Sequence, residues 1–330
     1  MDSTPPTDLT SKVGFEYRPE IKVLDCTIRD GGLINDHLFE DSLTRAVYEA
    51  CVAAGIDYME LGYKADNKIF ARDKFGAWKH CYEDDLRRIV GDNDTDLRLS
   101  VMADAEKTEY RRDIVPKDQS VIDIIRVATY IYQIPTAVDM IKDAHDKGYE
   151  VSANLMALST VPDAELQEGL NLLVKTPVDV IVLVDSNGAL FPHQIRDYTR
   201  RYLDAVKGTG KEVGIHCHNN LQLAFANTIE AAALGANRLD ATMNGIGRGA
   251  GNCSMELLLS FLRHHKYDFR PILHCIQDHF VPLREKIEWG CMIPYLITAH
   301  FNQHPRSAIK LRAGEDKDNI VDFYDQWIKS

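Results

Sequence analysis

The chain has 330 residues and a formal net charge of −12, and 45% of its residues are hydrophobic and 27% charged. This composition is typical of a globular protein, and the length suffices for one large core. The acidic balance argues against nucleic acids and anionic membranes as partners, although a local arginine or metal ion can still bind an anionic substrate. The longest apolar runs are far shorter than the roughly 20 residues that span a bilayer, so we expect no membrane partner.

The seven cysteines are scattered along the chain, and no two of them form a C-x-x-C pair. A disulfide framework or a zinc cluster would show paired or regularly spaced cysteines, so we expect reduced thiols. Residues 1–12 are polar and lack the apolar core of a signal peptide. These features together predict a cytoplasmic protein.

Eight short runs rich in apolar and β-branched residues are predicted to be strands. In chain order they cover residues 22–27, 58–61, 97–102, 122–128, 150–155, 178–184, 212–218 and 238–242. Several are nearly continuous apolar runs, which is typical of strands buried on both faces of a parallel sheet.

Amphipathic stretches of helical periodicity lie between the strands, at residues 41–54, 137–147, 164–174, 193–206 and 221–234. Glycine just after a helix and proline near its start are the expected punctuation. The alternation over residues 20–265 predicts a closed (β/α)8 TIM barrel. A doubly wound open sheet is the alternative, but it usually has fewer strands at this length.

Three segments fall outside the barrel pattern. We predict an N-terminal extension over residues 1–19, a catalytic barrel over 20–265, and a short helical C-terminal extension over 266–330. A polar insertion at residues 62–84 follows the second strand on the side where barrel active sites form, which suggests a lid.

The strongest local motif is His216-Cys217-His218 at the end of the seventh strand. Residues i and i+2 of a strand point to the same side, so both imidazoles face one point at the carboxyl end of the barrel. Two histidines and a carboxylate form an open site for a divalent cation. Taken alone, however, the two histidines could equally be packed or hydrogen-bonded side chains.

The second motif is Arg29-Asp30-Gly31-Gly32, directly after the first strand. Asp30 is a candidate third metal ligand, Arg29 can neutralise an enolate or carboxylate, and the glycines allow a tight turn. The alternative is an ion pair that closes a loop. Only one strand separates the first strand from the seventh around the ring, so both motifs can converge, which favours the metal site.

Two further loops carry candidate residues. The segment 244–252 after the eighth strand is rich in glycine, and Asn252 at its end is either a metal ligand or the N-cap of the next helix. Ser186, after the sixth strand, either binds a carboxylate or lies in a simple turn.

The sequences LDCTIRDG (24–31) and HCHNNLQLAFANTIEAAALGANRLDATMNGIGRGAGN (216–252) resemble the metal-dependent TIM-barrel lyase and synthase superfamily. That superfamily includes 3-hydroxy-3-methylglutaryl-CoA lyase, and the segment 124–160 is most similar to the 4-hydroxy-2-oxovalerate aldolase branch. The resemblance covers residues 20–265. It implies that Asp30, His216, His218 and Asn252 bind Mn²⁺, Mg²⁺ or another divalent metal.

The resemblance also implies roles in substrate binding and catalysis. Arg29 matches the arginine that stabilises the enolate oxygen, and Ser186 matches a residue near the keto-acid carboxylate. In the aldolases, however, a catalytic histidine stands where this chain has Leu33. His37, one turn later, and Tyr295, in the C-terminal extension, are therefore the candidates for the general base.

The activity implied is that of a class II carbon–carbon lyase. Such an enzyme would cleave or form a bond of a 4-hydroxy-2-oxo acid through a pyruvate-type enolate, so a 2-oxo acid and an aldehyde are the expected substrates. The family tends to form dimers, so we expect a homodimer. Two alternatives are a Claisen-type synthase that joins an acyl-CoA to a 2-oxo acid, and a barrel subunit that has lost catalysis.

Overall fold

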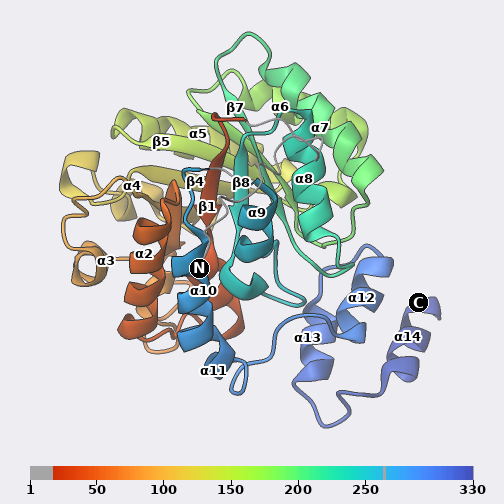
Figure 1. The fold of residues 1–330 in the computed structure, drawn as a ribbon. Coiled ribbons are helices and arrows are strands. Elements are labelled where there is room, and N and C mark those ends of the chain that lie inside the picture. Colours follow the sequence, from red (N-terminus) through yellow and green to blue (C-terminus); the bar gives the residue numbers. More distant parts are fainter. Residues whose placement is uncertain (1–17, 263–264, 330) are drawn as a thin grey trace, which may run out of the picture.

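The computed structural model describes residues 18–262 and 265–329. Eight parallel strands form a closed barrel in the order β1 to β8, and β8 pairs with β1 (Figure 1). The predicted TIM barrel is confirmed, and the alternative of an open sheet is wrong. The predicted N-terminal extension, residues 1–19, lies almost entirely outside the described residues.

The strands are short, and the elements alternate as in a (β/α)8 fold. The strands are β1 (Lys22–Asp25), β2 (Tyr58–Tyr63), β3 (Arg98–Asp104), β4 (Ile124–Thr129), β5 (Glu150–Leu155), β6 (Val180–Asp185), β7 (Glu212–Cys217) and β8 (Arg238–Ala241). The helices within the barrel are α1 (Thr27–Gly31), α2 (Asp41–Ala54), α3 (Glu83–Val90), α4 (Tyr110–Asp113), α5 (Ile134–Asp146), α6 (Asp163–Leu173), α7 (Pro192–Val206), α8 (Ala224–Leu234) and α9 (Met255–Leu262).

The helix ends follow the sequence signals closely. Helix α2 has the predicted bounds because Gly55, its C-cap, adopts a left-handed φ of 69°. Helix α7 begins at Pro192, whose fixed φ suits the first helical position. Other boundaries differ from the prediction by up to three residues, and α3 was not predicted from the sequence.

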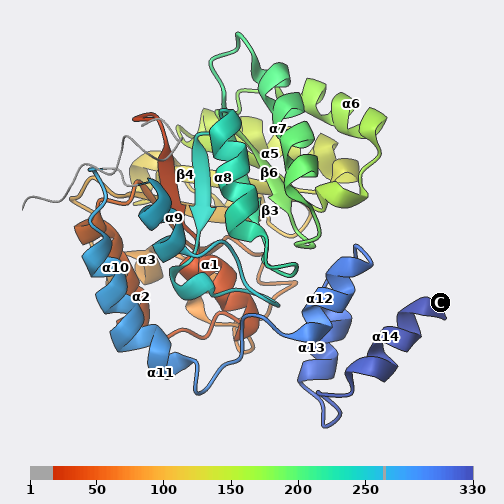
Figure 2. The ribbon, with the colours of Figure 1, turned by 45° about the vertical axis from the view of Figure 1, so that its right-hand side comes forward.

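The segment after the barrel is helical. Its helices are α10 (Phe269–Cys275), α11 (Val281–Leu283), α12 (Ile293–His300), α13 (Arg306–Arg312) and α14 (Ile320–Ile328). Helix α10 packs against α2 of the barrel, whereas α12, α13 and α14 share a small hydrophobic cluster. Figures 1 and 2 show these last three helices grouped at one end of the barrel, with α14 farthest out.

The insertion at residues 62–84 is anchored in the core. The side chain of Trp78 is fully buried, and its indole N–H donates to the Phe39 carbonyl at 3.2 Å. The backbone N–H of Gly76 donates to the Asp36 carbonyl at 2.9 Å. The insertion therefore packs on the segment that follows β1.

None of the described helices combines the length and the apolar character needed to cross a lipid bilayer.

The lumen of the barrel is layered. Charged residues at the amino ends of the strands pair with one another, as in the bond of 2.7 Å from Arg238 to Glu150. Above them lies an apolar layer that contains Leu24, Tyr58 and Ile124. The strands are therefore not purely apolar inside, as layered filling of a barrel permits when charges are paired.

A second charged layer lies above the apolar one. Arg126 of β4 is 2% exposed and donates to Glu60 of β2 at 3.0 Å and to Asp240 of β8. Three strands are thus joined through one guanidinium, inside a region of low dielectric where unpaired charge is costly.

We expect Arg126→Met to lower the free energy of unfolding by about 3 kcal/mol, because it leaves two buried carboxylates without this partner. Urea unfolding at neutral pH measures the change. The control is Arg87→Met, which removes an arginine paired with the exposed Asp92 and should change stability by less than about 0.5 kcal/mol. Equal effects of the two substitutions would contradict the role of Arg126.

Candidate active site

The chain leaves β1 and enters the short helix α1, which carries Arg29 and Asp30 into the carboxyl end of the barrel, where both are buried. The glycines that follow have right-handed helical φ values of −58° and −60°, and Gly32 begins a tight 3-10 turn over Gly32–Ile34. Gly32 is also needed for close packing, because a Cβ atom there would lie 2.1 Å from Nδ1 of His37.

His216 lies in strand β7, and His218 directly follows the strand. His216 and His218 are buried, and a ligand atom from each lies within 4.8 Å of one from Asp30 and of the other. Nε2 of His216 is 3.3 Å from Oδ2 of Asp30. The structure therefore brings together the three predicted ligands, which come from opposite sides of β8.

A carboxylate fixes the orientation of His216. Its Nδ1 lies 3.0 Å from Oδ2 of Asp240, so Nδ1 carries the proton and donates it, and Nε2 turns its lone pair to the site. This arrangement of carboxylate, histidine and site is typical of metal-ligating histidines.

Asn252 lies beside His218 through an isolated bridge between the two backbones. Its amide nitrogen donates to the Ile246 carbonyl at 3.0 Å, and its Oδ1 is buried without a hydrogen-bond partner among the described residues. Helix α9 begins only at Met255. This geometry favours the ligand interpretation of Asn252 over the N-cap interpretation.

The buried polar atoms fit a cation. Oδ1 of Asp30, Nε2 of His216 and Oδ1 of Asn252 all lack a hydrogen-bond donor among the described residues. Buried acceptors without a donor are costly, and oxygen and imidazole nitrogen are suitable ligands for Mn²⁺ or Mg²⁺. The group can therefore hold a divalent metal ion.

The protonation states agree with this fit. Burial opposes ionisation of Asp30, but Arg29 and the two histidines hold the pKa of its carboxyl well below the usual range. Burial lowers the pKa of His218 well below its usual value, so that imidazole is neutral at pH 7. Burial also opposes the charging of His216, but hydrogen bonds to Asp240 and Asp30 raise its pKa. A proton on Nε2 of His216, or a metal ion bound there, would each compensate the negative charge of Asp30.

A second group of metal-binding residue types, Cys26, His216 and Asp240, lies below the first. Burial raises the pKa of the Cys26 thiol well above its usual value, so the thiol stays protonated. Asp240 is already bonded to Arg126 and His216. This group therefore fits a hydrogen-bonded network rather than a metal ion.

Arg29 is held on two sides. Its Nε donates to Oε2 of Glu60 at 2.6 Å, and its Nη1 donates to Asp30. The predicted ion pair with Asp30 is therefore present, but it lies at the candidate metal site and does not exclude the catalytic role.

A small cavity of about 60 Å³ opens above these residues. Its polar lining contains Arg29, Asp30, Asn154, Ser186, His216, His218 and Arg248, and its apolar lining contains Leu33, Tyr63, Met102, Ala128, Met156 and Val184. The Ser186 hydroxyl accepts the Ala157 backbone N–H at 2.9 Å and remains free to donate into the cavity.

The two candidate bases are placed differently. His37 is 2% exposed, neither ring nitrogen has a hydrogen-bond partner among the described residues, and its ring lies edge-on to Tyr63 with centroids 5.3 Å apart. His37 does not line the cavity itself, but it contacts Tyr63, which does. Tyr295 lies in α12 within the cluster formed by the last three helices, and it does not line the cavity.

Four functional candidates escaped the sequence analysis: Glu60, Arg126, Asp240 and Arg248. The first three stand inside strands that are buried along most of their length. A charge in the middle of a strand buried on both faces is a usable signal, because it must be paired in the lumen. Arg248 lies in the glycine-rich loop and gives no such signal.

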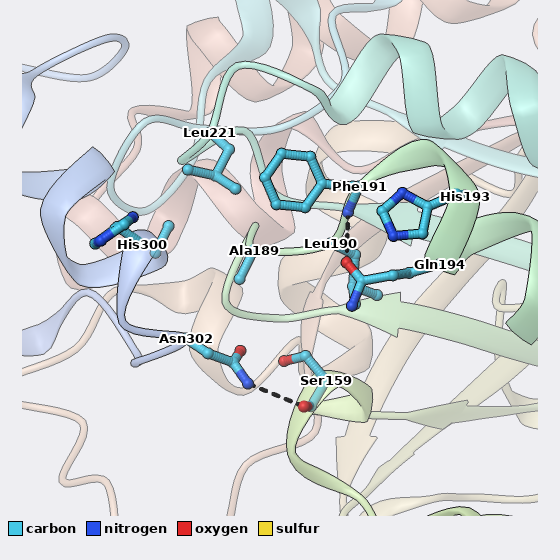
Figure 3. Close-up of a pocket in the computed structure, with 10 residues that line it drawn as sticks. Ser159, Ala189, Leu190, Phe191, His193, Gln194, Leu221, His300 and Asn302 are labelled. Carbon is cyan, nitrogen blue, oxygen red and sulfur yellow. Dashed lines mark hydrogen bonds between the residues drawn. The ribbon is translucent and has the colours of Figure 1, made fainter.

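A second pocket of about 380 Å³ lies between the start of α7 and helix α12 (Figure 3). In Figure 3, His193 and His300 lie on opposite sides of it, and the Asn302 amide donates to the Ser159 carbonyl at 2.9 Å. It contains none of the candidate metal ligands, so the smaller cavity is the candidate active site.

The fold and this site define a class: a TIM barrel with a buried group of metal-ligating residue types at the carboxyl ends of its strands. The HMGL-like family model matches residues 20–278. The chain therefore belongs to the HMGL-like family.

Two of the relatives carry different names. The chain is 30% identical over 260 residues to 4-hydroxy-2-oxovalerate aldolase from Pelotomaculum thermopropionicum, with 79% of the chain and 75% of the relative covered. It is 32% identical over 244 residues to oxaloacetate decarboxylase from Mycobacterium tuberculosis, with 73% and 69% covered.

Solved structures show the same barrel. The N-terminal domain of a candidate aldolase from Bacteroides vulgatus superposes with a TM-score of 0.77 at 29% identity, with 92% of this chain and 99% of that chain covered. HMG-CoA lyase from Brucella melitensis gives a TM-score of 0.64 at 14% identity, with 82% and 100% covered, which is a likeness of fold alone.

We expect Asp30→Asn to weaken Mn²⁺ binding by more than about 100-fold, beyond the usual effect of a residue that merely supports a ligand. Equilibrium dialysis followed by metal analysis measures the affinity. Asp163→Asn, at an exposed carboxylate paired with Arg201, is the control and should bind Mn²⁺ normally. Unchanged affinity of a folded Asp30→Asn protein would remove Asp30 from the ligand set.

Proposed function

We propose that the chain is a divalent-metal-dependent aldolase that cleaves or forms a carbon–carbon bond of a 4-hydroxy-2-oxo acid. The observation that carries this proposal is the convergence of Asp30, His216 and His218, whose ligand atoms lie within 4.8 Å of one another at the carboxyl end of the barrel. The relatives that are named aldolase and decarboxylase support a carbon–carbon lyase.

Asp30, His216, His218 and Asn252 would hold Mn²⁺ or Mg²⁺. The cation would supply Lewis acidity at the keto oxygen of the substrate. Arg29 is fixed by Glu60, so its guanidinium is already oriented when negative charge develops on the pyruvate-type enolate. The Ser186 hydroxyl is placed to donate to a substrate oxygen.

We propose a 2-oxo acid and an aldehyde as the substrates, a homodimer as the assembly, and the cytoplasm as the compartment. The 2-oxo acid is in keeping with the small polar end of the cavity.

Decarboxylation of oxaloacetate is a second candidate reaction, favoured by the 32% identical relative. Loss of carbon dioxide from oxaloacetate leaves the same pyruvate enolate as aldol cleavage. The same Arg29 and metal site would therefore serve either reaction, and the group that leaves distinguishes them.

The direct test is turnover of 4-hydroxy-2-oxovalerate and oxaloacetate by the Mn²⁺-loaded protein, with pyruvate measured as the common product. We expect activity that EDTA abolishes, that Mn²⁺ restores, and that His216→Ala lowers by at least about 100-fold. Activity that is insensitive to EDTA and to His216→Ala would overturn the proposal. Thiol release from acetyl-CoA with a 2-oxo acid would indicate the Claisen-type alternative, and a metal-loaded protein without turnover would indicate a barrel that has lost catalysis.

We expect His37 to act as the general base, because its ring lies against the cavity-lining Tyr63 and both of its ring nitrogens lack a hydrogen-bond partner among the described residues. His37→Asn should lower kcat by about 10² to 10⁴. Tyr295→Phe should change kcat by less than about twofold, because the hydroxyl lies outside the cavity.

NMR can follow the exchange of the methyl protons of pyruvate with D₂O. This exchange measures proton transfer at the methyl carbon separately from carbon–carbon bond cleavage. A large loss in Tyr295→Phe with normal exchange in His37→Asn would reverse the assignment. His37→Asn and Tyr295→Phe should bind equal amounts of Mn²⁺. A loss of exchange can then be attributed to proton transfer and not to loss of the metal.

A further inference from the structure

The candidate cavity has two arginines, and their partners differ. Arg29 is bonded to Glu60 and Asp30. Arg248 also lines the cavity, yet it forms no ion pair with any carboxylate of the described residues. Its Nε is buried without a hydrogen-bond partner, and its Nη2 reaches only the Ser186 carbonyl at 3.5 Å. A guanidinium whose Nε is buried without an acceptor gains from an anion that enters the cavity.

The loop that carries Arg248 is rigidly built. Gly249 has a left-handed φ of +66°, and a Cβ atom there would lie 2.8 Å from Oδ1 of Asn220. The same Oδ1 accepts the Ala250 backbone N–H at 3.0 Å. The loop therefore holds the guanidinium over the cavity rather than leaving it free to turn into solvent.

The paired charges around the candidate metal site favour an anion once a cation is bound. The three carboxylates Asp30, Glu60 and Asp240 are paired with only two arginines, Arg29 and Arg126. A divalent cation would reverse this deficit and leave a surplus of one positive charge, and Arg248 adds another. The carboxylate and enolate charges of a bound 2-oxo acid match that surplus.

The two sides of the cavity differ in polarity. Its charged and ligand-bearing groups come from the helix after β1, from the end of β7 and from the loop after β8, where Arg248 lies beside Ser186 of the loop after β6. The side chains from β2, β3 and β4 that line the opposite wall are Tyr63, Met102 and Ala128, which belong to one hydrophobic cluster. A polar group of the substrate is therefore favoured at one end and an apolar group at the other.

We infer that Arg248 binds the carboxylate of the 2-oxo acid, with Ser186 beside it, and so directs the remainder of the substrate to the apolar wall. This inference rests on the proposed function. It assigns the substrate a single anionic end and an apolar tail, and it leaves Arg29 free to act on the keto oxygen.

The test compares the affinity of the Mn²⁺-loaded protein for pyruvate with its affinity for the uncharged amide, pyruvamide. Water-proton relaxation measures both affinities. The unaltered protein should bind pyruvate more tightly than pyruvamide. Arg248→Met should weaken pyruvate binding by roughly tenfold to a hundredfold and leave pyruvamide binding nearly unchanged. Arg248→Lys, which keeps the charge, should lose less. Arg306→Met, at an exposed arginine in the C-terminal extension, is the control and should bind as the unaltered protein does.

The outcomes separate the inference from the proposed function. If the unaltered protein binds Mn²⁺ but neither pyruvate nor any 4-hydroxy-2-oxo acid, the proposed function fails. If it binds pyruvate and Arg248→Met binds it equally well, the inference alone fails. Weakened binding of oxaloacetate with normal binding of pyruvate would also overturn the inference, because Arg248 would then hold a remote carboxylate. If Arg248→Met does not fold, equal affinity of the unaltered protein for pyruvate and pyruvamide overturns it instead.

Discussion

The structure depends on a closed ring of buried ionisable side chains above the apolar layer of the barrel. Its members, in order around the ring, are Asp30, Arg29, Glu60, Arg126, Asp240 and His216. Each member is in contact with two others, so the loss of any one leaves buried neighbours incompletely paired. Because the members come from β2, β4, β7, β8 and the helix after β1, the ring also ties the carboxyl halves of these elements to one another.

The ring fixes the orientation of His216, one of the candidate metal ligands. Asp240 fixes the tautomer of His216 and is itself held by Arg126, whose charge is the main cause that lowers the pKa of Asp240 to about 2 despite burial. Asp240 therefore remains an acceptor at any pH at which the protein is expected to work. The position of His216 then depends on a rigid network, whereas that of Asn252 depends on the glycine-rich loop.

The sequence predicts those features that depend on local chemistry. Gly55 ends helix α2 where the left-handed conformation is required, and the i, i+2 spacing of His216 and His218 places both at the end of one strand. The ring was not predicted, because the pairing of Arg126 with both β2 and β8 depends on how the barrel closes. Arg248 was missed for a similar reason, since its direction is set by tertiary contacts of a loop.

The asymmetry of the cavity shows how one barrel can keep its chemistry while changing its substrate. The ligand-bearing side is locked by the ring, so a substitution there would disturb buried charges. The apolar wall carries no charge, and Phe70 of the insertion packs against it beside Tyr63. Met102 and Ala128 on that wall can change size at the modest cost of repacking an apolar surface. Tyr63 and Phe70 are more constrained, because the buried Lys79 ammonium lies 4.3 Å from the centroid of each ring. The insertion that follows β2 therefore shapes the apolar side of the cavity, even though it contributes no ligand to the candidate metal site.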